Sequence, residues 1–412
     1  MEISERILGL SEQATSDIDE RFREIDEIAL VNTEKVLAAF QRHRVSDGCF
    51  AGSTGYGYND KGREILDLVF ADVMGTPAAL VRAGFVSGTH AITSALFASL
   101  CPGQKLISAT GTPYDTLLGV IGITGSHRGS LKEFGISYSQ VELSESGAPD
   151  YNAIAEAARR SAVGAVLIQR SRGYSSRRAL SAREIGEICD TVHSANKDVV
   201  VFVDNCYGEF TESIEPGDAG ADLVAGSLIK NPGGGIAPTG GYVAGREDLV
   251  EAAAFRLTSP GIGGESGATL GVNRLLFQGL FMAPHTVAQA LKTAVFSARL
   301  FELMGYKVSP GYLDSRADIV QMIELGSPKL LESFCAGIQA SAPVDSFVSP
   351  VASDMPGYNF PVIMAAGSFI QGASIELSAD GPMREPYNVF IQGGLTFESG
   401  RLGIMRAASY LE

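Results

Sequence analysis

The sequence predicts an α/β protein, in which a large domain with a mostly parallel β-sheet is followed by a smaller α+β C-terminal domain. Three observations support this prediction. The chain has 412 residues, which exceeds the size at which a single hydrophobic core stops growing. Short apolar runs alternate with helical segments between about residues 75 and 245, the order expected of a doubly wound sheet. After residue 305 the patterns of strands and helices are mixed.

These patterns divide the chain into three parts. Residues 1–60 are an N-terminal helix and a glycine-rich arm, residues 61–280 the large domain, and residues 281–412 the small domain. Apolar residues at three- and four-residue steps between 17 and 44 predict one face of an amphipathic helix. They are Ile18, Phe22, Ile25, Ile28, Val36 and Phe40. The glycine-rich stretch 48–60 follows, and then a short helical pattern up to about Met74.

Five continuous apolar runs predict the strands of the large domain. They cover residues 78–86, 105–111, 164–171, 198–205 and 222–228. Runs without polar alternation are typical of parallel strands that are covered on both faces. Helices lie between them, one of them opened by the capping box Ser181-x-x-Glu184. Residues 266–304 predict one or two long helices.

Composition excludes several classes of protein. Hydrophobic residues make up 45% and charged residues 19%, a globular mixture. The formal net charge of −15 argues against nucleic acid or an anionic membrane as a partner. The five cysteines contain no CxxC pair and the five histidines no HExxH spacing, so neither disulfides nor a metal site are expected. Without a signal peptide or an apolar run near ~18 residues, we expect a cytoplasmic protein.

Two polar residues follow predicted strands at the edge where parallel sheets bind ligands. Asp204 ends the run VVVFVD, and Lys230 lies just past DLVAGSL. A carboxylate there needs a cation or a donor, and a lysine can act as a nucleophile when it is neutral. Taken alone, each residue is better explained without a ligand, Asp204 as a loop cap and Lys230 as a solvated surface residue. The glycines around Lys230, in GSLIKNPGGGIAPTGG, favour close approach to a bulky ligand.

Upstream, Ser87-Gly88-Thr89-His90 lies between a predicted strand and a helix. Its backbone amides form an anion site suited to a phosphate. His90 either caps the helix or helps to orient a substrate or cofactor. Tyr114 follows the next strand, where it either packs in the core or lies flat against a planar ring.

The order of these elements resembles fold-type I (aspartate aminotransferase-like) enzymes that use pyridoxal 5′-phosphate (PLP), and particularly the cystathionine and methionine γ-lyase family. SGTHA resembles that family's SGMAA turn, VDNCYGEF its VDNTFATP, and GSLIK its HSxTK. VDNCYGEF, GSLIKNPGGGIAPTGGYVAG and FIQGGLTFESGRLGI are closer still to the subfamily of aluminium resistance proteins, or carbon–sulfur lyases. This resemblance extends from residue 55 to the C-terminus.

The resemblance implies a role for each candidate residue. Lys230 holds PLP as a Schiff base and moves the α-proton, and Asp204 pairs with the ring nitrogen. The amides of Gly88 and Thr89, together with Ser87 and the Ser227 hydroxyl, hold the phosphate, while Tyr114 stacks on the ring. The implied reaction is β- or γ-elimination from a sulfur amino acid of the cysteine, cystathionine or methionine type. It releases a 2-oxo acid and ammonia.

The sequence also departs from the family. Ile229 stands where a hydroxyl residue usually precedes the lysine, so one phosphate donor is replaced. Tyr56-Gly57-Tyr58 stands where a neighbouring subunit contributes Tyr-x-Arg, so a homodimer or homotetramer with shared active sites is implied. Arg63 either substitutes for that arginine or is solvated.

The substrate carboxylate requires an arginine, because a guanidinium binds it through two hydrogen bonds. The small domain offers Arg316, Arg384, Arg401 and Arg406. We favour Arg384, which lies among prolines and glycine in ADGPMREPYNVF.

Three alternatives remain at this stage. The same scaffold also supports transamination or γ-replacement, since fold does not determine the reaction. A non-catalytic PLP-binding stress protein is the second alternative. The third, a nucleotide-dependent dehydrogenase, lacks a GxGxxG turn followed by an acidic residue. Nor does the sequence contain clustered carboxylates that would explain a link to aluminium.

Overall fold

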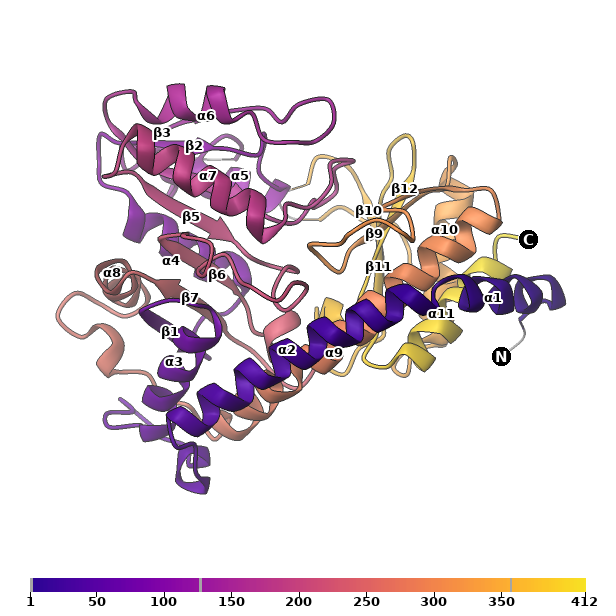
Figure 1. Cartoon of the computed structure of the whole chain (residues 1–412), viewed down its shortest axis with the longest axis horizontal. Coiled ribbons are helices and arrows are strands. Elements are labelled where there is room, and N and C mark those ends of the chain that lie inside the picture. The colour runs from indigo at the N-terminus through magenta and orange to yellow at the C-terminus, as the bar shows by residue number, and fades with distance from the viewer. Residues whose placement is uncertain (1–2, 126–127, 356–357) are drawn as a thin grey trace.

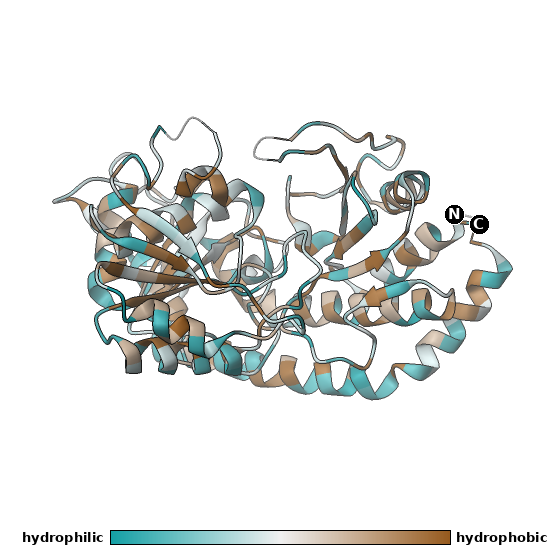
Figure 2. Ribbon diagram, turned by 90° about the horizontal axis from the view of Figure 1, so that it is seen from above, coloured by the Kyte–Doolittle hydropathy of each residue, from teal (hydrophilic) through white to brown (hydrophobic). Residues whose placement is uncertain are grey.

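The computed structural model describes residues 3–125, 128–355 and 358–412, which form two α/β units side by side (Figure 1). The large domain is built on a seven-stranded sheet and the small domain on a five-stranded sheet. Hydrophobic residues concentrate in the strands and on the sides of the helices that face them (Figure 2). The predicted α/β class, with a large, mostly parallel sheet, is confirmed.

The strands of the large sheet are arranged in the order β1-β7-β6-β5-β4-β2-β3. Their bounds are β1 (Ala78–Arg82), β2 (Lys105–Ser108), β3 (Ser137–Gln140), β4 (Val163–Gln169), β5 (Val200–Asp204), β6 (Leu223–Ser227) and β7 (Gly241–Gly245). Among these seven, β7 runs antiparallel to both of its neighbours, and the remaining pairs are parallel. The five predicted strands are present, each shorter than its apolar run.

Helices cover both faces of this sheet. They are α3 (Lys61–Val73), α4 (Gly88–Ser99), α5 (Asp115–Ile121), α6 (Tyr151–Ala158), α7 (Ala182–Ala195) and α8 (Glu247–Leu257). Every residue of β4 is buried. Leu167 belongs to the core that contains α4 and α8, whereas Val166 belongs to the core that contains α3 and α7. Burial of one such side chain stabilises the fold by roughly 1.5–3 kcal/mol, which explains why these strands contain no polar alternation.

The N-terminal helical pattern corresponds to two helices, α1 (Glu5–Asp17) and α2 (Asp19–Arg42), which meet at Ile18. Only the second was expected. The predicted capping box of α7 is present, because Ser181 accepts from the Glu184 amide and the Glu184 side chain accepts from the Ser181 amide.

The five strands of the small domain are all antiparallel, in the order β10-β11-β12-β9-β8. They are β8 (Lys307–Ser309), β9 (Gln321–Glu324), β10 (Val362–Ala365), β11 (Ser378–Pro382) and β12 (Asn388–Gln392). The strands β10 and β11 pack against α10 (Pro328–Ser341), which in turn packs against α11 (Phe397–Ser409). The predicted long helical region is one helix, α9 (Asn273–Leu303), which lies beside α2 and joins the two domains (Figure 1). The boundary predicted at residue 280 falls inside α9, and the domain division itself stays a prediction.

Within the described ranges, none of the helices has both the length and the apolar character that crossing a bilayer demands.

Candidate functional site

A cavity of about 300 Å³ lies between the carboxyl ends of β5 and β6 and the small domain. Seven of the predicted site residues line it: Ser87, Gly88, Thr89, Tyr114, Asp204, Ser227 and Lys230. They come from segments that are up to 143 positions apart, yet all follow strands or begin helices at one edge of the sheet. The fold therefore brings the phosphate turn, the aspartate and the lysine of the prediction together.

Lys230 and Asp204 occupy neighbouring strand ends. Asp204 is the last residue of β5 and pairs in register with Ala225 of β6, after which the chain leads to Lys230. Asp204 Oδ1 accepts a hydrogen bond from the Cys206 amide at 3.1 Å. The Lys230 Nζ atom lies 3.9 Å from the centre of the Tyr207 ring. Tyr207 itself has a φ of 72°, a left-handed conformation that is uncommon outside glycine and clusters at functional sites.

The ionisable groups of the cavity shift one another's pKa values. Burial raises the pKa of Asp204, while the charge of Lys230 and the Cys206 amide pull it back down. Burial lowers the pKa of Lys230, but the acidic groups around it, Cys206 and Tyr207 foremost, outweigh this, so its pKa lies well above the ordinary value. The acidic groups around Lys230 therefore favour its charged form.

The first turn of α4 forms a cradle beside this pair. The Ser87 side chain caps the helix by accepting from the His90 amide at 3.1 Å. The amides of Gly88 and Thr89, in the first turn, have no acceptor within the helix. A Cβ added at Gly88 would lie 3.0 Å from the Ser227 Cβ, so a larger residue would fill the space. The Ser227 hydroxyl, which lines the cavity, makes no hydrogen bond to the described residues.

Tyr114, at the N-terminus of α5, lines the cavity. Its amide donates to Gln169 Oε1 at 2.8 Å, and its hydroxyl lies 3.2 Å from Thr89 Oγ1. Burial raises the pKa of Tyr114 well above 10, with the charge of Asp204 as the second cause. The phenol is therefore a neutral donor at any physiological pH.

Two predicted substrate residues lie outside the cavity lining. His90 points the other way: its Nδ1 accepts from the Val86 amide at 3.3 Å and its ring packs edge-on against Phe85. The capping alternative fits this position better than a substrate contact. Arg384 is exposed at the rim, where its Nη2 donates to the Tyr174 carbonyl at 3.2 Å and its guanidinium lies 4.3 Å from the Phe360 ring centre.

The N-terminal arm is also outside the cavity of its own chain. Arg63 donates to the carbonyls of Gly57, Gly267 and Glu265, which fixes the arm to the large domain. It is therefore buried rather than solvated, and it does not line the cavity. Tyr56 and Tyr58 are 73% and 54% exposed, with their rings stacked 5.6 Å apart.

Several lining residues were not anticipated from the sequence. They are Asp115, Gln169, Ser171, Tyr174, Cys206, Tyr207, Tyr358, Asp380 and Gln392. Tyr207 and Cys206 stand in the VDNCYGEF segment, so their proximity to Asp204 was a usable signal. Asp380 could not be predicted as a site residue, because a single aspartate in a short strand forms no recognisable sequence motif.

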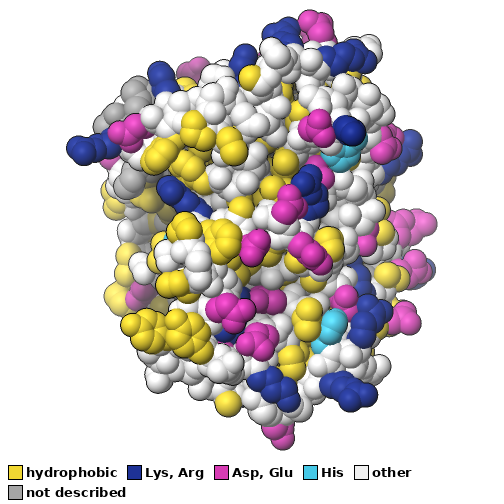
Figure 3. Space-filling model, turned by 90° about the vertical axis from the view of Figure 1, so that its left-hand side faces the viewer, with side chains coloured by type: hydrophobic (Ala, Val, Ile, Leu, Met, Phe, Trp, Pro, Cys, Tyr) yellow, Lys and Arg dark blue, Asp and Glu magenta, His cyan; other side chains and the backbone are white. Residues whose placement is uncertain are grey.

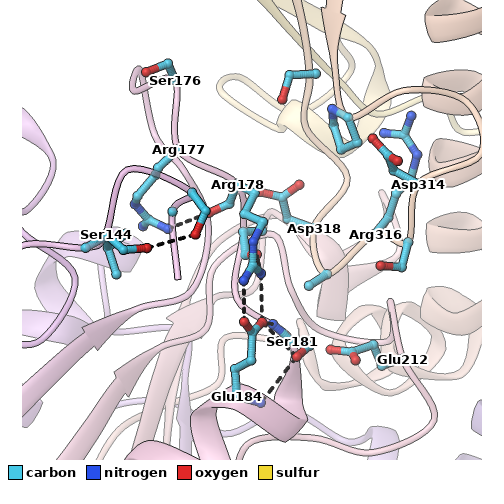
Figure 4. A pocket seen from close by; sticks show the side chains of 18 of the residues that line it. Ser144, Ser176, Arg177, Arg178, Ser181, Glu184, Glu212, Asp314, Arg316 and Asp318 are labelled. Atoms are coloured by element: carbon cyan, nitrogen blue, oxygen red, sulfur yellow. Dashed lines mark hydrogen bonds and ion pairs between the residues drawn. The ribbon is translucent and has the colours of Figure 1, made fainter. Parts of the chain in front are cut away.

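A second cavity, of about 660 Å³, lies on the far side of the 169–180 segment, between loops of the two domains (Figure 4). Two of its cations are engaged: Arg178 pairs with Glu184, and Arg177 donates to the Gln169 carbonyl at 2.7 Å. It contains neither Lys230 nor Asp204. The larger cavity is therefore not the candidate active site.

The residues of the 300 Å³ cavity fit PLP on structural grounds. The cradle at α4, with free amides and an unpaired Ser227 hydroxyl, suits a phosphate. Lys230 offers an amine, and buried Asp204 forms no salt bridge to a described side chain, so it can pair with a protonated ring nitrogen.

Comparison with known proteins agrees with this geometry. The sequence model of the family described as methionine gamma-lyase matches residues 7–412. The chain belongs to this family. Its members are PLP-dependent carbon–sulfur lyases, so the predictions of a PLP enzyme of fold-type I and of a lyase are confirmed at that level.

Several known proteins resemble the chain along most of its length. A carbon–sulfur lyase involved in aluminum resistance from Clostridium novyi NT is 52% identical, with a TM-score of 0.96 over 100% of this chain and 97% of that one. A Bacillus subtilis protein named only as YnbB is 48% identical over 97% of this chain and 95% of its own length. A PLP-dependent protein, YhfS of Escherichia coli, shares the fold at 20% identity, with a TM-score of 0.62 over 93% of this chain and 96% of that one.

Proposed function

We propose that the chain is a PLP-dependent lyase that eliminates the sulfur substituent of a cysteine-, cystathionine- or methionine-type amino acid and releases a 2-oxo acid and ammonia. The observation that carries this proposal is the joint lining of one cavity by Lys230, Asp204 and the first turn of α4. When bound, PLP supplies an electron sink for the carbanion at the substrate α-carbon. Binding of the cofactor and substrate, and the transfer of protons, depend on the side chains of the cavity.

In this proposal each side chain has a defined role in binding or in proton transfer. Asp204 would accept a charge-assisted hydrogen bond from the protonated ring nitrogen. Gly88, Thr89 and the Ser227 hydroxyl hold the phosphate, and Ile229 contributes no donor there. With PLP and substrate bound, Lys230 would take the proton from Cα as general base. The departing sulfur would be protonated either by Lys230, which then carries that proton, or by Tyr114, a neutral donor in the cavity.

Arg384 is our candidate for the substrate carboxylate. The three other arginines considered are tied elsewhere: Arg316 to Gln321, Arg401 to Ser11 and Arg406 to the Ala340 carbonyl. Arg384 contacts Tyr174, a lining residue, and its side chain is exposed beside the cavity.

Arg384→Lys is expected to raise KM by about tenfold or more with a small change in kcat, because a point charge replaces a bidentate fork. Steady-state kinetics on the best substrate checks this. Arg401→Lys, which alters a contact to Ser11 on α1, is the matched control and should leave KM unchanged. Equal KM values for the Arg384 variant and wild type would remove Arg384 from the site.

A panel of L-cysteine, L-cystathionine and L-methionine, followed by detection of 2-oxo acids and ammonia, tests the reaction. Release of both products from at least one of them supports elimination. If no oxo acid forms but an amino group is transferred to added pyruvate, the enzyme is a transaminase. If neither happens and the holoenzyme spectrum does not respond to amino acids, the chain is a non-catalytic PLP binder.

We also propose a cytosolic homodimer or homotetramer in which Tyr56 and Tyr58 complete the neighbour's phosphate site. Both rings are exposed on an arm that Arg63 anchors, and both lie outside their own cavity. The large-domain end of the molecule carries apolar patches among charged side chains (Figure 3), with Val86 and Leu270 among the exposed residues.

Sedimentation of the holoenzyme at low concentration is expected to show a dimer or tetramer. Replacing Tyr56 and Tyr58 together by alanine should weaken PLP retention several-fold without changing the fold, because the arm itself is anchored by Arg63. A PLP-loaded monomer would contradict the shared-site proposal.

A further inference from the structure

The charges that line the candidate active site do not balance. The charged lining side chains are Asp115, Asp204, Asp380 and Lys230. In the proposed function Asp204 and Lys230 serve the cofactor. Of the two remaining carboxylates, Asp115 is opposed by the charge of Arg384 at the rim, whereas Asp380 has no lysine or arginine other than Lys230 beside it among the described lining residues. A substrate with a neutral side chain would leave this part of the cavity uncompensated.

Asp380 stands on the wall that the small domain contributes. It lies on β11, and its Oδ2 accepts a long hydrogen bond, 3.4 Å, from Gln392 Nε2. The Tyr174 hydroxyl is within hydrogen-bonding reach of the same carboxylate. These two neutral donors orient Asp380 without neutralising it, and no described cation forms a salt bridge with it.

Aromatic rings surround this carboxylate. The Tyr174 ring centre lies 5.6 Å from that of Tyr358 and 5.3 Å from that of Phe390. Tyr207 packs against the same cluster from the large domain. Tyr174, Tyr207 and Tyr358 all line the cavity. Faces of electron-rich rings attract cations, and together with a carboxylate they form a site that favours an ammonium over an alkyl group.

Opposing influences set the pKa of Asp380. Burial raises its pKa to about 6, although the hydrogen bonds from Gln392 and Tyr174 and the charge of Lys230 act in the opposite direction. An ionised carboxylate that is largely withdrawn from water is costly unless a cation pairs with it. A cationic substrate group would supply that pair.

We propose that Asp380, framed by Tyr174 and Tyr358, selects amino-acid thioethers that carry an ammonium group beyond the sulfur. This inference rests on the proposed function and names its substrate class. In the reaction the C–S bond breaks, the α-proton is lost and the sulfur takes up a proton. With one water, S-(2-aminoethyl)-L-cysteine thus gives pyruvate, ammonia and 2-aminoethanethiol, with no oxidant or reductant involved.

The test compares two substrates of nearly equal shape, S-(2-aminoethyl)-L-cysteine and S-propyl-L-cysteine, in which an ammonium replaces a terminal methyl group. We expect wild-type holoenzyme to prefer the aminoethyl compound by about ten- to a hundred-fold in kcat/KM, the range of a hydrogen-bonded charge pair. L-Cystathionine, with an ammonium and a carboxylate at its distal end, shows whether the natural source of that ammonium is a second amino acid.

Asp380→Asn should reduce the preference to within about threefold, chiefly by raising KM for the aminoethyl compound, with the propyl compound little affected. Asp115→Asn is the matched control, because it removes the same charge from the rim, where Arg384 already opposes it. It should keep most of the preference. Equal use of both substrates by the wild type, or equal losses in the two variants, would overturn the inference.

Failure of the proposed reaction can be told apart from failure of this inference. If neither compound yields pyruvate, the lyase proposal is wrong for this class. The melting temperature of the holoenzyme with each compound then decides: greater stabilisation by the aminoethyl compound, lost in Asp380→Asn, supports the ammonium site, and equal stabilisation overturns it.

Discussion

Lys230→Ala is expected to give a folded protein that cannot hold PLP covalently and has no measurable lyase activity. The side chain reaches into the cavity with no hydrogen bond to the described residues, so its loss removes chemistry rather than packing. Nζ is the amine positioned beside Asp204 and the α4 cradle. It is also the only amine among the described residues that line the cavity.

Borohydride reduction followed by peptide mapping checks this prediction directly. In the wild type the pyridoxyl group should be recovered on Lys230, and in the variant on no lysine. Lys307→Ala, at an exposed lysine that pairs with Glu324, is the control and should label like the wild type. Recovery of the group on another lysine would refute the whole arrangement of the site. Circular dichroism of the variant distinguishes lost chemistry from lost folding.

Much of the large domain could be predicted because its strands are buried on both faces. Val166 and Leu167 face opposite helical layers, so the strand around them is a continuous apolar run that is easy to recognise in the sequence. The two missed strands lack this signal. β3 has the sequence SYSQ at the edge of the sheet, and β7 is a five-residue strand that begins and ends in glycine. Pairing with neighbours, rather than their own composition, makes them strands.

The residues of the candidate site likewise include some that could be predicted from the sequence and some that could not. Lys230, Asp204 and Gly88 could be predicted because each follows a strand or begins a helix, and the sheet brings such ends together. Asp380 and Tyr174 could not, because they approach the cavity only when the small domain packs against the large one. For His90 the sequence suggested a contact that the structure does not show. Its place in the turn suggested a ligand contact, but the direction of a helical side chain is not visible in the order of residues.

Asp204→Ala is expected to lower kcat by several orders of magnitude while PLP remains bound. Asp204 is buried at the end of β5. In the proposed function its carboxylate would keep the ring nitrogen of the cofactor protonated. Without that charge, bound PLP would be a weaker electron sink for the removal of the α-proton by Lys230, and each 1.36 kcal/mol added to the barrier would cost about tenfold in rate. The phosphate cradle and Lys230 are untouched, so cofactor retention should persist.

Cofactor content, measured from the visible absorbance of the purified variant, separates this outcome from simple loss of PLP. Asp204→Asn, which keeps the shape and one acceptor but not the charge, should be almost as impaired as the alanine variant. Asp248→Ala removes the same charge from an exposed pair with Arg246 and should behave like the wild type. A PLP-loaded Asp204→Ala enzyme within tenfold of wild-type kcat would mean that another group protonates the ring, and the assignment of Asp204 would then be wrong.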